Sequence, residues 1–240
     1  MLSHTLAGAQ REISDAWRVL ARLGLVDTIF NHISFTVEDA SGQTLLMNPS
    51  ACMADELRPD LVRAFPVREY KSEEGDTLGV NPDGLRLHSL MHQARGSVGA
   101  VVHTHSVHAI AVSCSTTGLL PLSQTAVEFV DDVRIIEYDG VFRQHALSPE
   151  TTRLATDGGV ALLRHHGSLV VADSIAEAVY LTFYLEEACR IQVMTTAQGT
   201  DFSTLPKSIV AETAKKLRQN RPVVAAQLFE ALRRQLPNTP

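Results

Sequence analysis

An apolar run that ends in two alternate histidines constrains the fold of this chain more than any other feature. Residues 98–102 read Val-Gly-Ala-Val-Val, and His103-Thr104-His105 follows directly. A short apolar run of this kind predicts a buried strand over residues 98–104. Because residues two apart in a strand point to the same side, the pattern aims two imidazoles at one point. It predicts a sheet with the start of a divalent transition-metal site at one strand end.

Helix and strand patterns alternate along the rest of the chain. Apolar spacing and turn residues predict helices at residues 5–23, 60–64, 85–95, 108–112, 149–156 and 174–198, with one or two more in 206–236. They predict further strands at 33–36, 44–47, 133–137, 160–164 and 168–171, and a surface turn at 72–76. Interleaved strands and helices are typical of an α/β or α+β fold, so we expect a single domain over residues 1–240.

Composition narrows the function classes. The chain has 240 residues, a net charge of −6 and no basic block, so we expect no nucleic-acid partner. Its apolar runs fall short of a membrane helix and its first residues do not resemble a signal peptide, so we expect no membrane partner and a cytoplasmic location. Three scattered cysteines predict small buried residues rather than disulfides, a thiolate metal site or a nucleophile.

A third histidine lies where a metal site would need it. His166 follows the predicted strand 160–164, in the segment Leu163-Arg-His-His-Gly167. Together with His103 and His105 it would complete a three-imidazole site with open coordination positions. The spacing alone leaves a second interpretation open, in which each histidine is a hydrogen-bonded core residue.

Several segments together resemble the class II aldolase and adducin-head family. They cover roughly residues 5–200 and are Asn31-His-Ile-Ser34, Met47-Asn-Pro-Ser50, the helix with His88, Val101-Val-His-Thr-His105, Leu163-Arg-His-His-Gly167 and the helix with Glu177. The resemblance implies a three-layer αβα sandwich with a central, largely antiparallel sheet. It also implies a homo-oligomer, often a four-fold ring, with active sites at subunit boundaries. His103, His105 and His166 would bind a divalent metal, usually zinc, with manganese or iron as alternatives.

The chain departs from the family where its aldolases place Ser-Ser-Glu before a helix. That stretch here is Pro82-Asp83-Gly84, so the position of the proton-transferring glutamate falls on Gly84. Pro82 has no N–H to donate to a phosphate and Asp83 would repel one, which disfavours a phosphosugar substrate. The family's Gly-Asn pair appears as Asn31-His32. These features are closer to the adducin-like branch, and a glutamate at position 84 would be expected to return a carboxylate to the metal.

The remaining histidines each have two interpretations. His165 alternates with His166, so we expect it to face away, although a swap of roles is open. His88 and His92 are four apart on one helix face and could support a metal, but we expect them to be satisfied core residues. His108 is expected beside the metal ligands or at a subunit interface.

The resemblance also assigns residues to the substrate. His32, Asn48 and Ser50 lie in turns that the family uses to hold the far end of the substrate. His32 would bind a carboxylate or phenolic oxygen as an imidazolium, or only hydrogen-bond the turn backbone. Asp83 would either replace the missing acid-base group or cap the helix at Leu85, and we favour the cap.

These features predict a metal-dependent lyase acting on a small, non-phosphorylated oxo- or hydroxy-acid. Without the glutamate, decarboxylation is favoured over aldol cleavage, since it needs no base to remove a hydroxyl proton. The alternatives are a non-catalytic adducin-like binding module and a non-haem iron oxygenase. We also expect a homotetramer in which the C-terminal helices at about 206–236 lie at a subunit interface, through Val223, Val224, Leu228 and Leu232.

Overall fold

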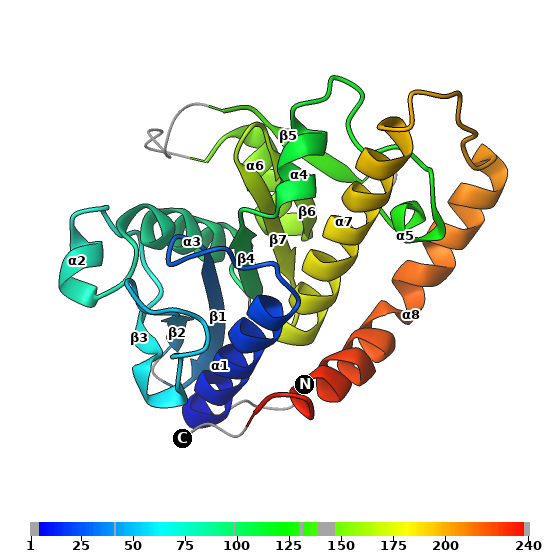
Figure 1. Ribbon diagram of the computed structural model, residues 1–240. Helices are drawn as coiled ribbons and strands as arrows, with labels where there is room; N and C mark the ends of the chain where they lie inside the picture. Colours follow the sequence, from blue (N-terminus) through cyan, green and yellow to red (C-terminus); the bar gives the residue numbers. More distant parts are fainter. Residues whose placement is uncertain (1–4, 41, 98, 130–131, 139–146, 238–240) are drawn as a thin grey trace.

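A seven-stranded sheet forms the centre of the molecule (Figure 1). The computed structural model describes residues 5–40, 42–97, 99–129, 132–138 and 147–237. The strand order is β3-β2-β1-β4-β7-β6-β5, and every neighbouring pair is antiparallel except β5 and β6. The predicted largely antiparallel sheet is therefore confirmed. The strands are β1 His32–Asp39, β2 Gly42–Met47, β3 Arg63–Pro66, β4 Ala100–Thr104, β5 Val133–Ile136, β6 Gly159–Leu163 and β7 Gly167–Ala172.

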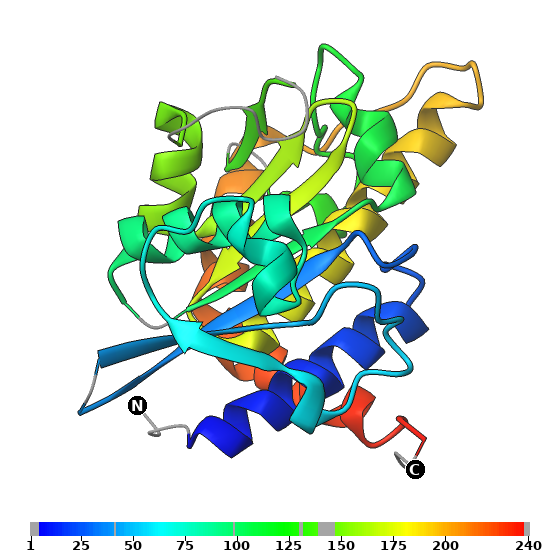
Figure 2. The ribbon, with the colours of Figure 1, turned by 90° about the vertical axis from the view of Figure 1, so that its left-hand side faces the viewer.

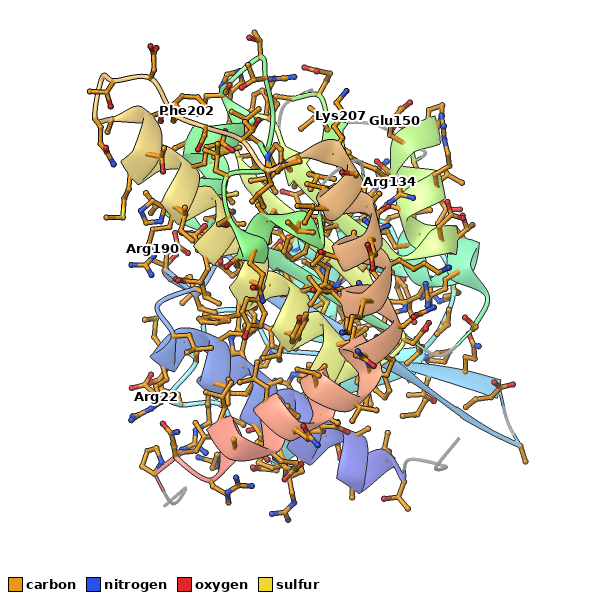
Figure 3. All side chains as sticks on the ribbon, turned by 90° about the vertical axis from the view of Figure 1, so that its right-hand side faces the viewer. Arg22, Arg134, Glu150, Arg190, Phe202 and Lys207 are labelled. Atoms are coloured by element: carbon orange, nitrogen blue, oxygen red, sulfur yellow. The ribbon has the colours of Figure 1, made fainter. Side chains whose placement is uncertain are left out.

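Helices cover both faces of the sheet and make it the middle of three layers. On one face lie α1 Leu6–Arg22, α4 Val107–Ser113, α5 Gln124–Val127 and α7 Ile175–Thr196, with α8 Lys207–Arg233 outside α7 (Figure 3). On the other face lie α2 Glu74–Leu78, α3 Pro82–Arg95 and α6 Pro149–Asp157 (Figure 2). A short 3-10 helix spans Pro59–Leu61.

The alternation of buried residues explains how the strands join the layers. Val102 packs in the core beneath α1 and α7, whereas Val101 packs with residues of α3 and α6. In β1, Ile33 and Phe35 face the α1–α7 core, so His32 and Ser34 face α3. His103 lies two residues after Val101 and faces α3 as well. The sheet therefore carries its polar side chains into the layer that holds α3.

The structure corrects two predicted elements, and it decides between one and two helices in a third region. Residues 60–64 were expected to be helical, but the 3-10 turn stops at Leu61 and Arg63–Pro66 form β3. A proline is tolerated there because β3 is an edge strand. The expected turn at residues 72–76 leads into α2. The region after Pro206 is one helix, α8, which contains Pro222.

The C-terminal helix divides its apolar residues between the core and the surface. Leu228 and Leu232 pack against the core of their own chain, whereas Val223 and Val224 are exposed. Only half of the predicted interface residues are therefore free for a neighbour. Among the described residues, no helix has the length and apolar character that crossing a membrane requires.

Candidate metal centre

Three histidines converge where β4 and the β6–β7 turn meet. His103 lies in β4 with its side chain on the α3 side of the sheet. His105 is the first residue after β4, and His166 lies in the turn between β6 and β7. One ring nitrogen of each lies within 4.8 Å of the others. The Nε2 atoms of His103 and His105 are 3.1 Å apart. His103 is buried while the other two are half-buried, so the group is open on one side.

The β6–β7 turn can bring in His166 because Gly167 has no side chain. A Cβ atom at Gly167 would lie 2.2 Å from the carbonyl oxygen of Thr104. The start of β7 therefore approaches the end of β4 as only glycine allows. The turn itself is closed by a hydrogen bond from the His166 N–H to the Leu163 carbonyl oxygen, at 3.0 Å. This local geometry sets His166 beside His103.

Contacts at Nδ1 hold two of the imidazoles with Nε2 toward the centre, through a hydrogen bond for His103 and a charged contact for His105. His103 donates its Nδ1–H to the Ser168 carbonyl oxygen at 2.9 Å. His105 places Nδ1 3.5 Å from an Asp27 carboxylate oxygen and donates its backbone N–H to the Asn31 side chain at 2.9 Å. Asn31 also donates to Asp27. Engaging Nδ1 in this way leaves Nε2 as the metal donor, the usual arrangement of metal-binding histidines.

Asp27 was not foreseen from the sequence. It lies in the loop after α1, 78 residues before His105, and its contact forms only when the chain folds. Burial alone would raise the pKa of Asp27, but the hydrogen bond from Asn31 and the nearby His105 lower it overall. Asp27 is therefore an ionised carboxylate that orients His105. The one signal in the sequence is its spacing from Asn31, since an Asp and an Asn four apart can meet in a short loop.

A second group of imidazoles closes the α3 side of the centre. His32 is the register partner of His103 across β1 and β4, and their rings stack with centroids 5.3 Å apart. The His88 ring meets His32 edge-on at 5.6 Å. Ser34 Oγ lies 2.6 Å from His88 Nδ1 and 2.8 Å from His92 Nε2. All of these side chains are buried.

Burial keeps this second group uncharged. It lowers the pKa of His32 and His88 well below the ordinary value, with neighbouring histidines adding to the effect, and lowers that of His92 to about 3. The pKa values of His103 and His166 fall for the same reason. Neutral imidazole is the form that binds metal, so the three-histidine group fits a divalent ion.

Asp83 does not take the role expected of it. Helix α3 begins at Pro82, and its N-cap is Asn81, whose side chain accepts a hydrogen bond from the Gly84 N–H at 2.9 Å. The predicted cap by Asp83 at Leu85 is therefore wrong. Burial raises the pKa of the Asp83 carboxyl, but among the described residues the donor group around the centre does not include it.

The two predicted turn residues differ in what they contact. Asn48 is buried, and its side chain accepts the Ile33 N–H at 2.9 Å and lies 3.4 Å from the Asn31 carbonyl oxygen. It therefore holds the start of β1 in place. Ser50 is half-buried in the following turn, and its backbone N–H donates to the Gly79 carbonyl oxygen. Their predicted contact with substrate stays a prediction.

Two further histidines among the described residues, His165 and His108, lie outside the centre. His165 is exposed, and its Nδ1 lies 3.2 Å from Cys114 Sγ, so His166 rather than His165 joins the group. The expectation that every cysteine is buried is wrong for Cys114, which is exposed. His108 lies 2.7 Å from a Glu186 carboxylate oxygen and links α4 to α7.

Comparison with known proteins agrees with this geometry. A family model described as "Class II Aldolase and Adducin N-terminal domain" matches residues 11–193. The chain belongs to this family. It is 33% identical over 203 residues to a Pseudomonas aeruginosa protein with a provisional class 2 aldolase name, covering 83% of this chain and 76% of that protein.

Two further relatives show the spread of the family. A crystal structure of an aldolase II superfamily protein from Pseudomonas syringae superposes with a TM-score of 0.83 at 28% identity, over 98% of this chain and 94% of that one. Rat beta-adducin is 26% identical over 193 residues, which are 79% of this chain but only 26% of the adducin. The same domain thus occurs both as most of a protein and as a part of a larger one.

Proposed function

We propose that this protein is a metal-dependent lyase that breaks a C–C bond in a small, non-phosphorylated oxo- or hydroxy-acid. The observation that carries the proposal is the group of His103, His105 and His166, open on one side, with the first two rings oriented by their Nδ1 contacts. A divalent ion held there supplies Lewis-acid stabilisation of the negative charge that develops on a substrate oxygen as the adjacent bond breaks. The relative named as a class 2 aldolase supports a lyase.

The residues around the centre favour decarboxylation over aldol cleavage. Retro-aldol cleavage needs a base that removes a hydroxyl proton, whereas CO2 leaves unaided and only the remaining carbanion must be protonated. Within the described ranges, the donor group contains no carboxylate. Asp27 contacts Nδ1 of His105, the nitrogen that does not face His103, and so orients a ligand. A reaction that needs no protein base at the metal suits this arrangement.

The first turn of α3 also disfavours a phosphorylated substrate. Pro82 has no N–H, and the N–H of Gly84 is used by the Asn81 side chain. The Asp83 carboxylate would repel a phosphate dianion. A helix N-terminus often binds phosphate through free N–H groups, and this one offers little of that chemistry.

Metal analysis combined with a substrate screen tests the proposal. We expect about one divalent ion per chain in purified protein, with zinc favoured over manganese or iron. We also expect CO2 release that stops on chelation, from acids whose oxo group lies β to the departing carboxylate, because the carbanion left behind is then an enolate. Protein that holds no metal would favour a binding module of the adducin kind. Iron with oxygen uptake would favour an oxygenase, and cleavage of a sugar phosphate would contradict the proposed substrate class.

We also propose that the protein is a homotetramer with α8 at a subunit interface. The exposed apolar side chains of Ile209, Val223 and Val224 on α8 support this. Light scattering at micromolar concentration should give about four times the mass of the chain. A monomer at that concentration would contradict the proposal.

A further inference from the structure

The His32 ring packs so closely against the Gly84 backbone that it leaves no room for a side chain at position 84. A Cβ atom built on Gly84 would lie 2.8 Å from each of three ring atoms of His32, namely Cγ, Cδ2 and Cε1. The ring cannot easily move aside, because it stacks on His103 and meets His88 edge-on. It is also only 4% exposed. A side chain at position 84 would therefore have to occupy the space that the imidazole of His32 fills.

That space borders the metal centre. Gly84 lies in the first turn of α3, and His32 lies directly opposite His103 in the sheet. A side chain at position 84 would begin in the space of the His32 ring, which itself stacks on His103. We therefore expect a glutamate at position 84 to return a carboxylate to the metal only when His32 is replaced.

His32 also retains unused hydrogen-bonding capacity. Neither of its ring nitrogens, both inaccessible to solvent, has a hydrogen-bond partner among the described residues. The Asn81 side chain is near enough to favour the charged form of the ring, but its oxygen accepts the Gly84 N–H. A buried polar atom without a partner is costly, so packing against Gly84, His88 and His103 rather than hydrogen bonding holds the ring in place.

We propose that His32 determines specificity: it excludes a carboxylate at position 84 of α3 from the metal, so that the site takes a substrate that brings its own carboxylate. The inference rests on the proposed metal-dependent function. Three neutral imidazoles add no negative charge, so a divalent ion among them keeps its full charge and favours an anionic chelating ligand. A small acid that binds through its carboxylate and a neighbouring oxygen has this chemistry.

A stability cycle tests the contact without any metal. Replacing a helical glycine by alanine ordinarily stabilises a protein. We expect Gly84→Ala to lower the Tm of the metal-free protein when His32 is present, and to raise it in a His32→Ala background. The same sign of change in both backgrounds would overturn the proposed overlap of the two residues.

Metal affinity tests the consequence for the site. We compare Gly84→Glu alone, Gly84→Glu with His32→Asn, and Gln93→Glu, which adds the same charge to an exposed position of α3. In zinc titrations of the intact protein, the double variant should bind at least about tenfold more tightly than the wild type, because the glutamate now reaches the metal. Gly84→Glu alone and Gln93→Glu should show no gain. An equal gain in Gly84→Glu alone, or none in the double variant, would overturn the proposal.

Oxalate serves as the probe for ligand class. Calorimetry on zinc-loaded protein should show oxalate binding to the wild type and at least about tenfold weaker binding to the double variant, in which a protein carboxylate already occupies the metal. Equal binding would overturn the specificity role. If the wild type binds no zinc, the proposed function fails, while the stability cycle still reports on the contact between His32 and Gly84.

Discussion

Two walls border the metal centre, and they differ in whether the ring nitrogens of their histidines have partners. The hydrogen-bonded wall consists of His105, Asp27, Asn31 and the Ser168 carbonyl. Asp27 and Asn31 contact His105, and the Ser168 carbonyl contacts His103. The α3 wall consists of His32, Ser34, His88 and His92. On the first wall each Nδ1 has a partner, so Nε2 is directed to the centre. On the α3 wall, each of the three histidines has at least one ring nitrogen without a partner among the described residues.

This contrast in ring-nitrogen partners indicates what each wall contributes to the centre. A metal ligand needs a fixed tautomer and orientation, and a partner for the far nitrogen supplies both. A buried imidazole with unpaired nitrogens supplies volume and a neutral, dry surface instead. The same residue type is thus oriented for metal binding on one wall and fills space on the other. The following substitutions separate these two uses.

The largest contrast is between His105→Ala and His88→Ala. The first removes a ligand, so we expect stoichiometric metal to be lost while the fold persists. The second removes a buried ring of the α3 wall, so we expect the metal to stay and the free energy of unfolding to fall by about 2–4 kcal/mol. Metal analysis and urea unfolding of both variants check this. Stoichiometric metal in His105→Ala would remove His105 from the centre.

A substitution at Gly167 should displace the third histidine of the metal centre. The new Cβ of Gly167→Ala would lie against the Thr104 carbonyl oxygen, which belongs to the backbone and cannot rotate away. We expect a loss of about 3 kcal/mol in stability, at the upper end of overpacking costs, and weaker zinc binding because His166 is displaced. Urea unfolding and zinc titration measure the two effects. Unchanged values in both would show that β7 can shift at no cost.

Acid should destabilise the α3 wall because its histidines are neutral in the folded state. Burial lowers the pKa of His88, and that of His92 to about 3, whereas both titrate near 6.5 when unfolded. Below pH 6.5 the unfolded chain takes up protons that the folded chain cannot. Stability is thus constant above about pH 7 and falls as pH decreases, by about 2 kcal/mol per histidine at pH 5.

Urea unfolding of metal-free protein between pH 8 and pH 5 measures this loss. His92→Gln is the informative variant, since glutamine keeps a polar side chain of similar length but does not titrate. We expect a shallower decline of stability with acid in this variant than in the wild type. Identical slopes would mean that His92 is protonated in the folded protein.

Asp27→Asn alters the hydrogen-bonded wall without removing a candidate metal ligand. The amide keeps the shape of the side chain but removes the charge that favours a proton on His105 Nδ1. Partners of this kind commonly contribute tenfold or more to metal affinity, so we expect zinc to bind about tenfold more weakly. Asp55→Asn removes an exposed carboxylate and should bind zinc like the wild type. Equal affinities in the two variants would show that Asp27 does not orient the ligand.

The parts of the centre that could be predicted are those with local patterns. Strand alternation places His103 and His105 on one side, and the order of strands and helices indicates the layered fold. His166 lies far along the chain, so its position after a predicted strand made it a candidate ligand, and the family resemblance favoured that role over a core histidine. The contact of Asp27 with His105 and the overlap of Gly84 with His32 depend on tertiary packing, which no periodicity encodes.

The errors in the fold have a similar origin. Residues 60–64 were predicted to be a helix because Pro59 resembles a helix start, and the strand that overlaps their end is short and ends in a proline. Edge pairing with β2 decides that segment, and pairing is not visible in a local window. Helix α2 is likewise one short turn that packs against α3, and its acidic sequence alone indicates a surface turn.

The smallest expected effect separates two adjacent histidines. His165 adopts a left-handed backbone conformation with φ of 61°, a conformation that asparagine tolerates better than most residues. Its ring contacts Cys114 and lies outside the metal group. We expect His165→Asn to leave zinc affinity within about twofold of the wild type and to change stability by less than about 0.5 kcal/mol. His166→Ala, one residue away, should lose stoichiometric metal. If instead His165→Asn loses the metal and His166→Ala keeps it, the turn presents the other histidine to the centre.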